Sequence, residues 1–68
     1  MVTNLKVGDK VTYIDDFSYL QIGIVKTIRD NDAAWIVYHC SNNWKEYKDY
    51  TGCLTYNSDM KLGWLIKA

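Results

Sequence analysis

The side chains best suited to chemistry are concentrated between residues 33 and 53 of this 68-residue chain. The stretch contains the single His, both Cys, two of the three Trp and three of the six Tyr. A cysteine nucleophile needs a base within hydrogen-bond reach, and His39 and Cys40 are sequence neighbours. Residues 33–40 are expected to form a strand, however, and neighbours in a strand point to opposite faces of a sheet. We therefore expect a hydrogen-bonded His, a structural Cys and no catalytic residues.

A metal site and a carboxylate pair are the next candidates. Structural zinc takes about four ligands in closely spaced pairs, whereas Cys40 and Cys53 are separated by twelve residues, with one His beside them. The acid pairs Asp15/Asp16 and Asp30/Asp32 stand where turns are expected, and such acids are normally solvated turn formers. Phosphate-binding glycine loops, dinucleotide fingerprints and nucleophile elbows do not occur. The sequence thus predicts a protein that is not an enzyme and has no metal site and no cofactor.

Composition indicates a single domain, residues 1–68, that needs additional stabilisation. A chain this short buries only about 60% of its unfolded surface, so aromatic packing and self-association are the expected aids. Net charge is zero and the pI is near 6.5, which argues against phosphate-driven binding to nucleic acid. The sequence has no run of about 20 apolar residues, so no membrane span is expected. No signal-peptide core is recognised either. A cytoplasmic location is expected, with Cys40 and Cys53 as free thiols and a disulfide between them as the alternative.

Alternation and β-branched content predict the secondary structure. A hairpin through the polar turn at 30–32 is expected to join the second and third strands. Gly23, inside the second strand, indicates a bulge or a close backbone approach. Asn43 is a reasonable helix cap, and aromatic residues every three positions after it suit a short helical or 3₁₀ turn around residues 43–50. Five strands are predicted, over residues 10–14, 21–29, 33–40, 53–56 and 62–66.

Short strands at this spacing favour a small barrel or a curled sheet. The segments VGDKVTY, GIVKTI and AAWIVYH resemble the opening of SH3-like families such as KOW and Tudor domains, over roughly residues 5–40. The expected fold is mostly β, a five-stranded SH3-like small barrel with one short helical turn around residues 43–50.

The whole chain also resembles short proteins encoded by phages and prophages. The shared features are VGDKV, GIVK, a closing LGW at 62–64 and a WxxYxxYTG run made by Trp44, Tyr47, Tyr50, Thr51 and Gly52. This resemblance implies a phage-type accessory protein in the cytoplasm of a bacterial host, and it implies no particular activity.

The chain has more aromatic residues than a small barrel can bury. A barrel core is expected from Val7, Val11, Tyr13, Ile24, Ile28, Ile36, Tyr38, Leu54, Leu62, Trp64 and Ile66. Trp35, Trp44, Tyr47, Tyr50 and Tyr56 are then left partly outside, and Tyr and Trp are residues that dominate interfaces. Three interpretations stay open: the 41–52 segment folds over the barrel as a second small core, the aromatics form a homo-oligomer interface, or they form a ligand surface. The predicted ligand-binding residues are Trp35, Trp44, Lys45, Tyr47, Lys48 and Tyr50.

Three functions follow from these features. The first is a non-catalytic homo-oligomer that sequesters a nucleotide-type host signal in an anti-defence role. Its aromatics would stack on a base while Lys45, Lys48 or Arg29 meets a phosphate. The second is an SH3-like peptide- or protein-binding module for a host protein, in which two acids attract a basic partner. Its groove would use Tyr13, Phe17, Tyr19, Trp35, Asp15 and Asp16. The third is a KOW-type nucleic-acid accessory domain, which the zero net charge disfavours. No membrane partner is expected.

Overall fold

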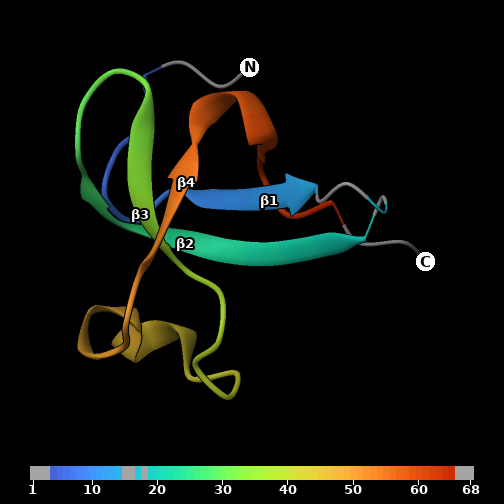
Figure 1. Cartoon of the computed structure of the whole chain (residues 1–68). Coiled ribbons are helices and arrows are strands. Elements are labelled where there is room, and N and C mark those ends of the chain that lie inside the picture. Colours follow the sequence, from blue (N-terminus) through green and yellow to red (C-terminus); the bar gives the residue numbers. More distant parts are fainter. Residues whose placement is uncertain (1–3, 15–16, 18, 66–68) are drawn as a thin grey trace.

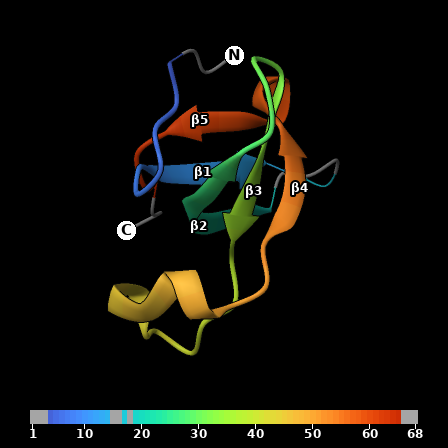
Figure 2. The same cartoon turned by 90° about the vertical axis from the view of Figure 1, so that its left-hand side faces the viewer.

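The chain folds into one five-stranded antiparallel sheet in the order β4-β3-β2-β1-β5 (Figure 1; Figure 2). The structure is a computed structural model and describes residues 4–14, 17 and 19–65. Two 3₁₀ helices accompany the strands, and no helix among these residues is long and apolar enough to cross a membrane. The elements are β1 (Lys10–Ile14), β2 (Leu20–Ile28), β3 (Ala33–Val37), η1 (Trp44–Asp49), β4 (Cys53–Tyr56), η2 (Asn57–Asp59) and β5 (Met60–Leu62). The predicted mostly-β fold is confirmed.

Strand β2 bends the sheet. Its first half pairs with β1 and its second half with β3, and the register shifts between Val25 and Thr27. Gly23 makes the predicted close approach, since a Cβ at this position would lie 2.6 Å from the Cγ2 atom of Ile36. The sheet therefore curls and is not closed, because β4 and β5 form its two edges and are not neighbours in the strand order.

The β2–β3 hairpin is confirmed, and an aspartate organises its turn. Asp30 Oδ1 accepts hydrogen bonds from the backbone N–H groups of Asp32 at 2.8 Å and Ala33 at 3.1 Å. Its other carboxylate oxygen accepts from Arg29 Nε at 2.9 Å. An aspartate that bonds the backbone two and three residues ahead is the side-chain device expected of such a turn.

The concave face of the sheet carries the core. Val11, Val25, Ala34, Ile36 and Met60 form one buried cluster, and Leu5 and Tyr38 pack against it. The strand register puts the strand members of this cluster on one face.

The predicted core list was right in part. Val11, Ile24 and Ile36 are buried, whereas Val7 and Leu62 are exposed. Ile28 and Leu54 are also exposed, while Tyr13, Tyr38 and Trp64 are half-buried. Val25 and Met60 were missed, and Ile66 lies outside the described residues.

Residues on the opposite face of the sheet are covered as well. Thr12 and Val37 on this face are almost fully buried, and so is Cys40 in the segment after β3. The Thr12 hydroxyl donates a hydrogen bond to the carbonyl oxygen of Gly63 at 2.7 Å and accepts one from the N–H of Leu65 at 2.8 Å. The segment after β5 is thereby fixed across this face, which gives the small domain a second buried layer.

Two predicted boundaries were wrong. The third strand ends at Val37 instead of residue 40, and it is followed by a turn in which Ser41 and Asn42 have positive φ. The last strand is Met60–Leu62 instead of 62–66, because Gly63 has φ of +88° and interrupts extended pairing. The helical turn forms as η1, but the side chain of Asn43 makes no capping hydrogen bond.

Candidate ligand-binding pocket

The predicted ligand-binding residues lie mainly on η1, and they pack against their own chain. The Trp44 ring lies 5.0 Å from the Trp64 ring at an angle of 55°. Lys48 Nζ lies over the Tyr47 ring, 6.0 Å from its centroid. The backbone oxygen of Tyr50 accepts a hydrogen bond from Lys26 Nζ at 2.6 Å. These contacts fit the interpretation of the 41–52 segment as a second small core.

The other two predicted residues are placed differently. Lys45 is exposed on η1. Trp35 pairs with Leu54 on the face of the sheet opposite the main core, and 39% of its surface is exposed. None of the six predicted residues lines either of the two pockets described below.

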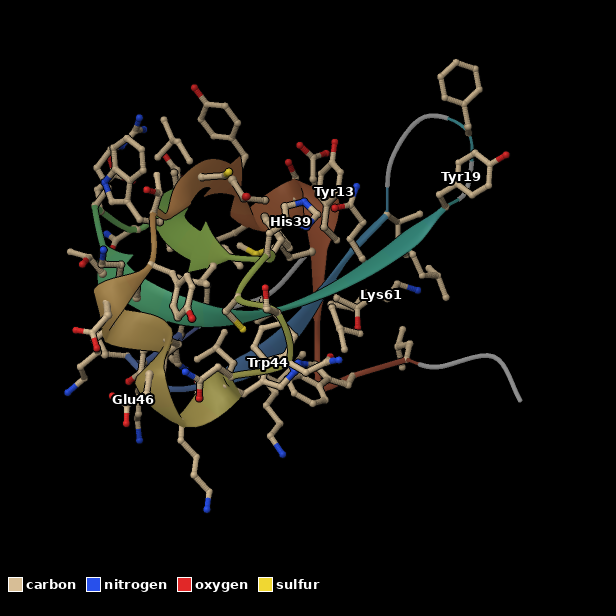
Figure 3. All side chains as sticks on the ribbon, turned by 90° about the horizontal axis from the view of Figure 1, so that it is seen from below. Tyr13, Tyr19, His39, Trp44, Glu46 and Lys61 are labelled. Atoms are coloured by element: carbon tan, nitrogen blue, oxygen red, sulfur yellow. The ribbon has the colours of Figure 1, made fainter. Side chains whose placement is uncertain are left out.

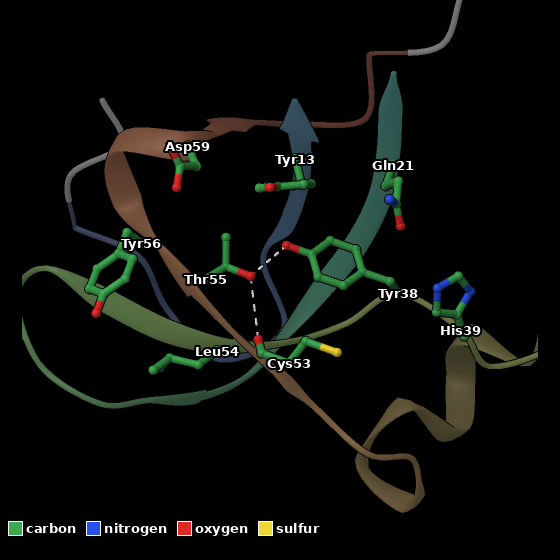
Figure 4. Close-up of a pocket in the computed structure, with 9 residues that line it drawn as sticks. All are labelled: Tyr13, Gln21, Tyr38, His39, Cys53, Leu54, Thr55, Tyr56 and Asp59. Carbon is green, nitrogen blue, oxygen red and sulfur yellow. Dashed lines mark hydrogen bonds between the residues drawn. The ribbon is translucent and has the colours of Figure 1, made fainter. Parts of the chain in front are cut away.

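A pocket of about 300 Å³ opens at one end of the concave face (Figure 4). The register pairs Tyr13 with Gln21, on the same face as Val11 and the rest of the core cluster. The pocket thus begins where core side chains leave the concave face unfilled, and it extends to the β4 edge, where Leu54 and Tyr56 face the other way by register. We call it the tyrosine pocket; its lining is Tyr13, Gln21, Tyr38, His39, Cys53, Leu54, Thr55, Tyr56 and Asp59.

Two tyrosine rings are held in fixed positions in this pocket. The rings of Tyr13 and Tyr38 lie 6.0 Å apart at an angle of 59°. The Tyr38 and Thr55 hydroxyl oxygens are 2.7 Å apart, and the Thr55 hydroxyl donates to the carbonyl oxygen of Cys53 at 3.3 Å. Because a hydroxyl has one hydrogen, Thr55 accepts the hydrogen bond that Tyr38 donates. Figure 4 shows this chain of hydrogen bonds in the middle of the pocket.

The electrostatics of the tyrosine pocket disfavour negative charge. The pKa of Tyr38 is raised to about 12, mainly by burial; the hydrogen bond to Thr55 opposes this rise, and the neighbouring Cys53, Tyr13 and Asp59 contribute to it. The Tyr38 hydroxyl therefore stays neutral at physiological pH. Among the described residues that line the pocket, Asp59 is the carboxylate and there is no Lys or Arg.

The two pocket rings differ from other aromatic rings of the molecule in their neighbours. Lys10 Nζ lies 4.7 Å from the Trp64 ring centroid, and the Arg29 guanidinium carbon lies 5.6 Å from the Tyr56 centroid. Within the described part of the chain, no Lys or Arg occupies such a position over Tyr13 or Tyr38. Aromatic faces attract cations, so these rings and Asp59 form a place for a positive group.

The pocket brings His39 and Cys53 to one site, a combination that the sequence analysis did not weigh. No hydrogen bond joins His39 to either cysteine in the region that the structure covers. Cys40 is buried, Cys53 is exposed and both thiols are free, which confirms free thiols over a disulfide. The described residues also contain no group of three or more side chains that could hold a metal ion.

The tyrosine pocket was missed by sequence reasoning for a specific reason. Tyr38 and Tyr13 were placed in the core by strand alternation, and the structure leaves both half-buried at its open end. Asp59 was not among the predicted site residues. Alternation identifies the concave face, but it does not tell which end of that face remains unfilled. No known protein family, curated protein or solved structure matches the chain.

Alkaline unfolding should report the environment of Tyr38. Its folded pKa is about 12 against an ordinary value of 10, so unfolding releases a proton between these two pH values. The stability contributed by the protonated hydroxyl is fully present below pH 10 and is lost as the pH rises toward 12. We expect the melting temperature, followed by circular dichroism, to fall over this window. Tyr38→Phe should flatten the fall, and Tyr19→Phe, at an exposed tyrosine, should keep it; equal slopes for all three proteins would contradict this assignment.

Proposed function

We propose that this protein is a non-catalytic, SH3-like binding module whose tyrosine pocket receives a basic side chain from a segment of a partner protein. The strand order β4-β3-β2-β1-β5 and a 3₁₀ helix before the last strand support the SH3-like assignment. A bent β2 shared by both halves of the sheet supports it too.

The observation that carries this proposal is the pairing of two tyrosine rings with one carboxylate. A Lys or Arg head group over such rings gains about 0.5–2 kcal/mol, depending on its desolvation. A partly exposed ion pair with Asp59 adds about 0.2–1 kcal/mol. Together these give weak binding, so a partner must also make contacts outside the pocket.

Exposed aromatic side chains near the pocket provide such contacts. Ile14 and Leu20 form the last pair between β1 and β2, next to Tyr13. The segment that connects them carries Phe17, which is 81% exposed, and Tyr19, which is 69% exposed. Figure 3 shows Tyr19 at the end of this hairpin, beyond Tyr13. Exposed aromatics of this kind bury large areas on binding.

The groove expected for a peptide-binding module needs one correction. Trp35 faces the side of the sheet opposite Tyr13, since it pairs with Leu54 and not with a core position. Trp35 lines neither of the two described pockets. Asp15 and Asp16 lie outside the described residues.

Sequestration of a nucleotide-type signal by a homo-oligomer stays a prediction with a different location. Its phosphate partners Lys45 and Lys48 are exposed on η1, whereas the tyrosine pocket offers a carboxylate to any phosphate that enters. A phage-type accessory role in a bacterial cytoplasm also stays a prediction, as does the KOW-type alternative.

Binding of a basic peptide tests the proposed function. Fluorescein-labelled decapeptides of Gly and Ser carrying one Arg, one Gln or one Glu are titrated with the protein, and anisotropy gives the Kd. We expect the Arg peptide to bind, and Asp59→Asn to weaken it by about 2–5-fold, equivalent to roughly 0.4–1 kcal/mol. Asp49→Asn is the matched control, because it removes one acid on η1 outside the pocket lining.

Two results would count against the proposal. One is equal affinity for the Arg and Gln peptides. The other is the same weakening by Asp49→Asn as by Asp59→Asn, which would indicate general charge attraction. Two other results together would favour the nucleotide hypothesis instead. One is a native mass above that of one chain. The other is a nucleotide that raises the melting temperature equally in the unchanged protein and in Asp59→Asn.

A further inference from the structure

We infer that the binding groove continues past Tyr56 into a second pocket that also receives a basic group, so that the partner segment carries two basic residues. This inference rests on the proposed function of the tyrosine pocket. The second pocket, here the turn pocket, has a volume of about 300 Å³. It lies between the β2–β3 turn and η2, and its lining is Arg29, Asn31, Asp32, Tyr56, Asn57 and Ser58.

Tyr56 connects the two pockets. It is the last residue of β4, it lines both pockets and half of its surface is exposed. The helix η2 that follows contributes Asn57 to the turn pocket and Asp59 to the tyrosine pocket. One aromatic side chain thus separates two hollows that a single extended segment can reach.

Asn57 supplies an acceptor without a donor. Asn57 is 7% exposed, and its Nδ2 donates a hydrogen bond to the backbone oxygen of Asn31 at 3.0 Å. Its backbone N–H donates to the backbone oxygen of Asp32 at 2.7 Å. Its Oδ1 is buried and has no hydrogen-bond partner among the described residues. A buried acceptor that lacks a donor is rare in native proteins and needs an explanation. Asn57 lines the turn pocket, so a donor that enters this pocket can supply one after a small side-chain movement uncovers Oδ1.

The charged groups that line the turn pocket also favour a ligand that donates hydrogen bonds. Arg29 is already engaged, since its Nε donates to Asp30 at 2.9 Å and its guanidinium lies over the Tyr56 ring. The Asp32 carboxylate accepts no hydrogen bond from the part of the chain that the structure describes. Asp32 and Asn57 thus offer acceptors that no described donor uses, and a Lys or Arg head group can supply the donor.

The tyrosine pocket and the turn pocket thus both suit a basic side chain. Each presents one carboxylate, Asp59 or Asp32, and Tyr56 lies between them. Side chains on one face of an extended peptide recur every second residue. Basic residues spaced by two or four positions are therefore the ones to test.

The experiment compares singly and doubly basic peptides. Labelled Gly/Ser decapeptides carry one Arg, or two Arg at spacings of two, three or four residues, and Kd is measured by anisotropy. At one even spacing we expect the second Arg to tighten binding by about tenfold, which is 1.4 kcal/mol. Asp32→Asn and Asp32→Ser should each abolish this gain and leave the single-Arg peptide unaffected. Both variants are used because either alone can disturb the β2–β3 turn, and thermal melting checks their folding.

The outcomes separate this inference from the function on which it rests. If the single-Arg peptide binds in a manner that depends on Asp59, and the second Arg adds nothing, the turn pocket is overturned and the proposed function stands. Equal gains at all three spacings that survive Asp32→Asn also overturn the turn pocket. If no Arg peptide binds, the proposed function fails and this inference fails with it.

Discussion

Replacing Trp64 with alanine is expected to lower the free energy of unfolding by about 3–5 kcal/mol, the range for deleting a large packed aromatic side chain. Trp64 Nε1 donates a hydrogen bond to the backbone oxygen of Gly23 at 2.8 Å, across 41 positions of sequence. Its ring packs on Trp44 at 5.0 Å, and Lys10 Nζ lies 4.7 Å from its centroid. One side chain therefore ties the segment after β5 to β2, β1 and η1.

Urea unfolding of a small series of variants measures this effect. A domain of this size has a total stability of about 3–10 kcal/mol, so Trp64→Ala is expected to be largely unfolded, and Trp64→Phe is the quantitative variant. Trp64→Phe keeps a ring, loses the N–H donor and should cost about 1–3 kcal/mol.

Trp35→Ala is the matched control, because it deletes the same side chain from a position where 39% of the surface is exposed. Its cost should be clearly smaller than that of Trp64→Ala. Equal costs for Trp35→Ala and Trp64→Ala would show that the Trp44–Trp64 layer does not stabilise the fold as the contacts indicate.

The parts of the fold that sequence reasoning predicted are those with local causes. The β2–β3 hairpin follows from alternation and from an Asp-rich turn, in which Asp30 bonds the backbone directly. The helical turn at 44–49 follows from aromatic residues three positions apart. Five strands and a bent second strand are likewise local statements, and they are the statements that hold.

The parts that failed depend on contacts between distant residues. Met60 is buried and Leu62 is exposed, although both lie on β5 and face the same way by register, because Leu62 lies at the end of an edge strand. No local pattern distinguishes these two residues. The contact between Trp44 and Trp64, twenty positions apart, is likewise not indicated by any local pattern, and the role of Trp44 in ligand binding stays a prediction. The tyrosine pocket arises in the same way, since Tyr13 and Tyr38 meet only when β1 and the end of β3 curl toward each other.

Gly23→Ala is expected to destabilise the protein by about 3 kcal/mol, at the upper end of the range for overpacking a core. A Cβ here would lie 2.6 Å from Ile36 Cγ2, 2.8 Å from Tyr38 Cδ1 and 2.9 Å from the backbone oxygen of Val37. The third contact is with backbone on the neighbouring strand, which cannot move aside as a side-chain tip can. Gly23 is therefore required by space and not by its backbone angles, because it is not among the glycines at positive φ.

Gly63→Ala separates the two reasons for a glycine. Gly63 has φ of +88° and nothing within 4 Å of an added Cβ, so its substitution should cost only the backbone strain of about 1–2 kcal/mol. Chemical denaturation of both variants gives the comparison, and a smaller cost for Gly23→Ala than for Gly63→Ala would contradict the steric crowding expected at Gly23.

Gly23→Ala should also weaken Arg-peptide binding under conditions where it remains folded, because the displaced Tyr38 is one of the two rings that define the pocket. Gly63→Ala should leave that binding unchanged. The two variants together therefore test whether the close approach at Gly23 also sets the geometry of the tyrosine pocket.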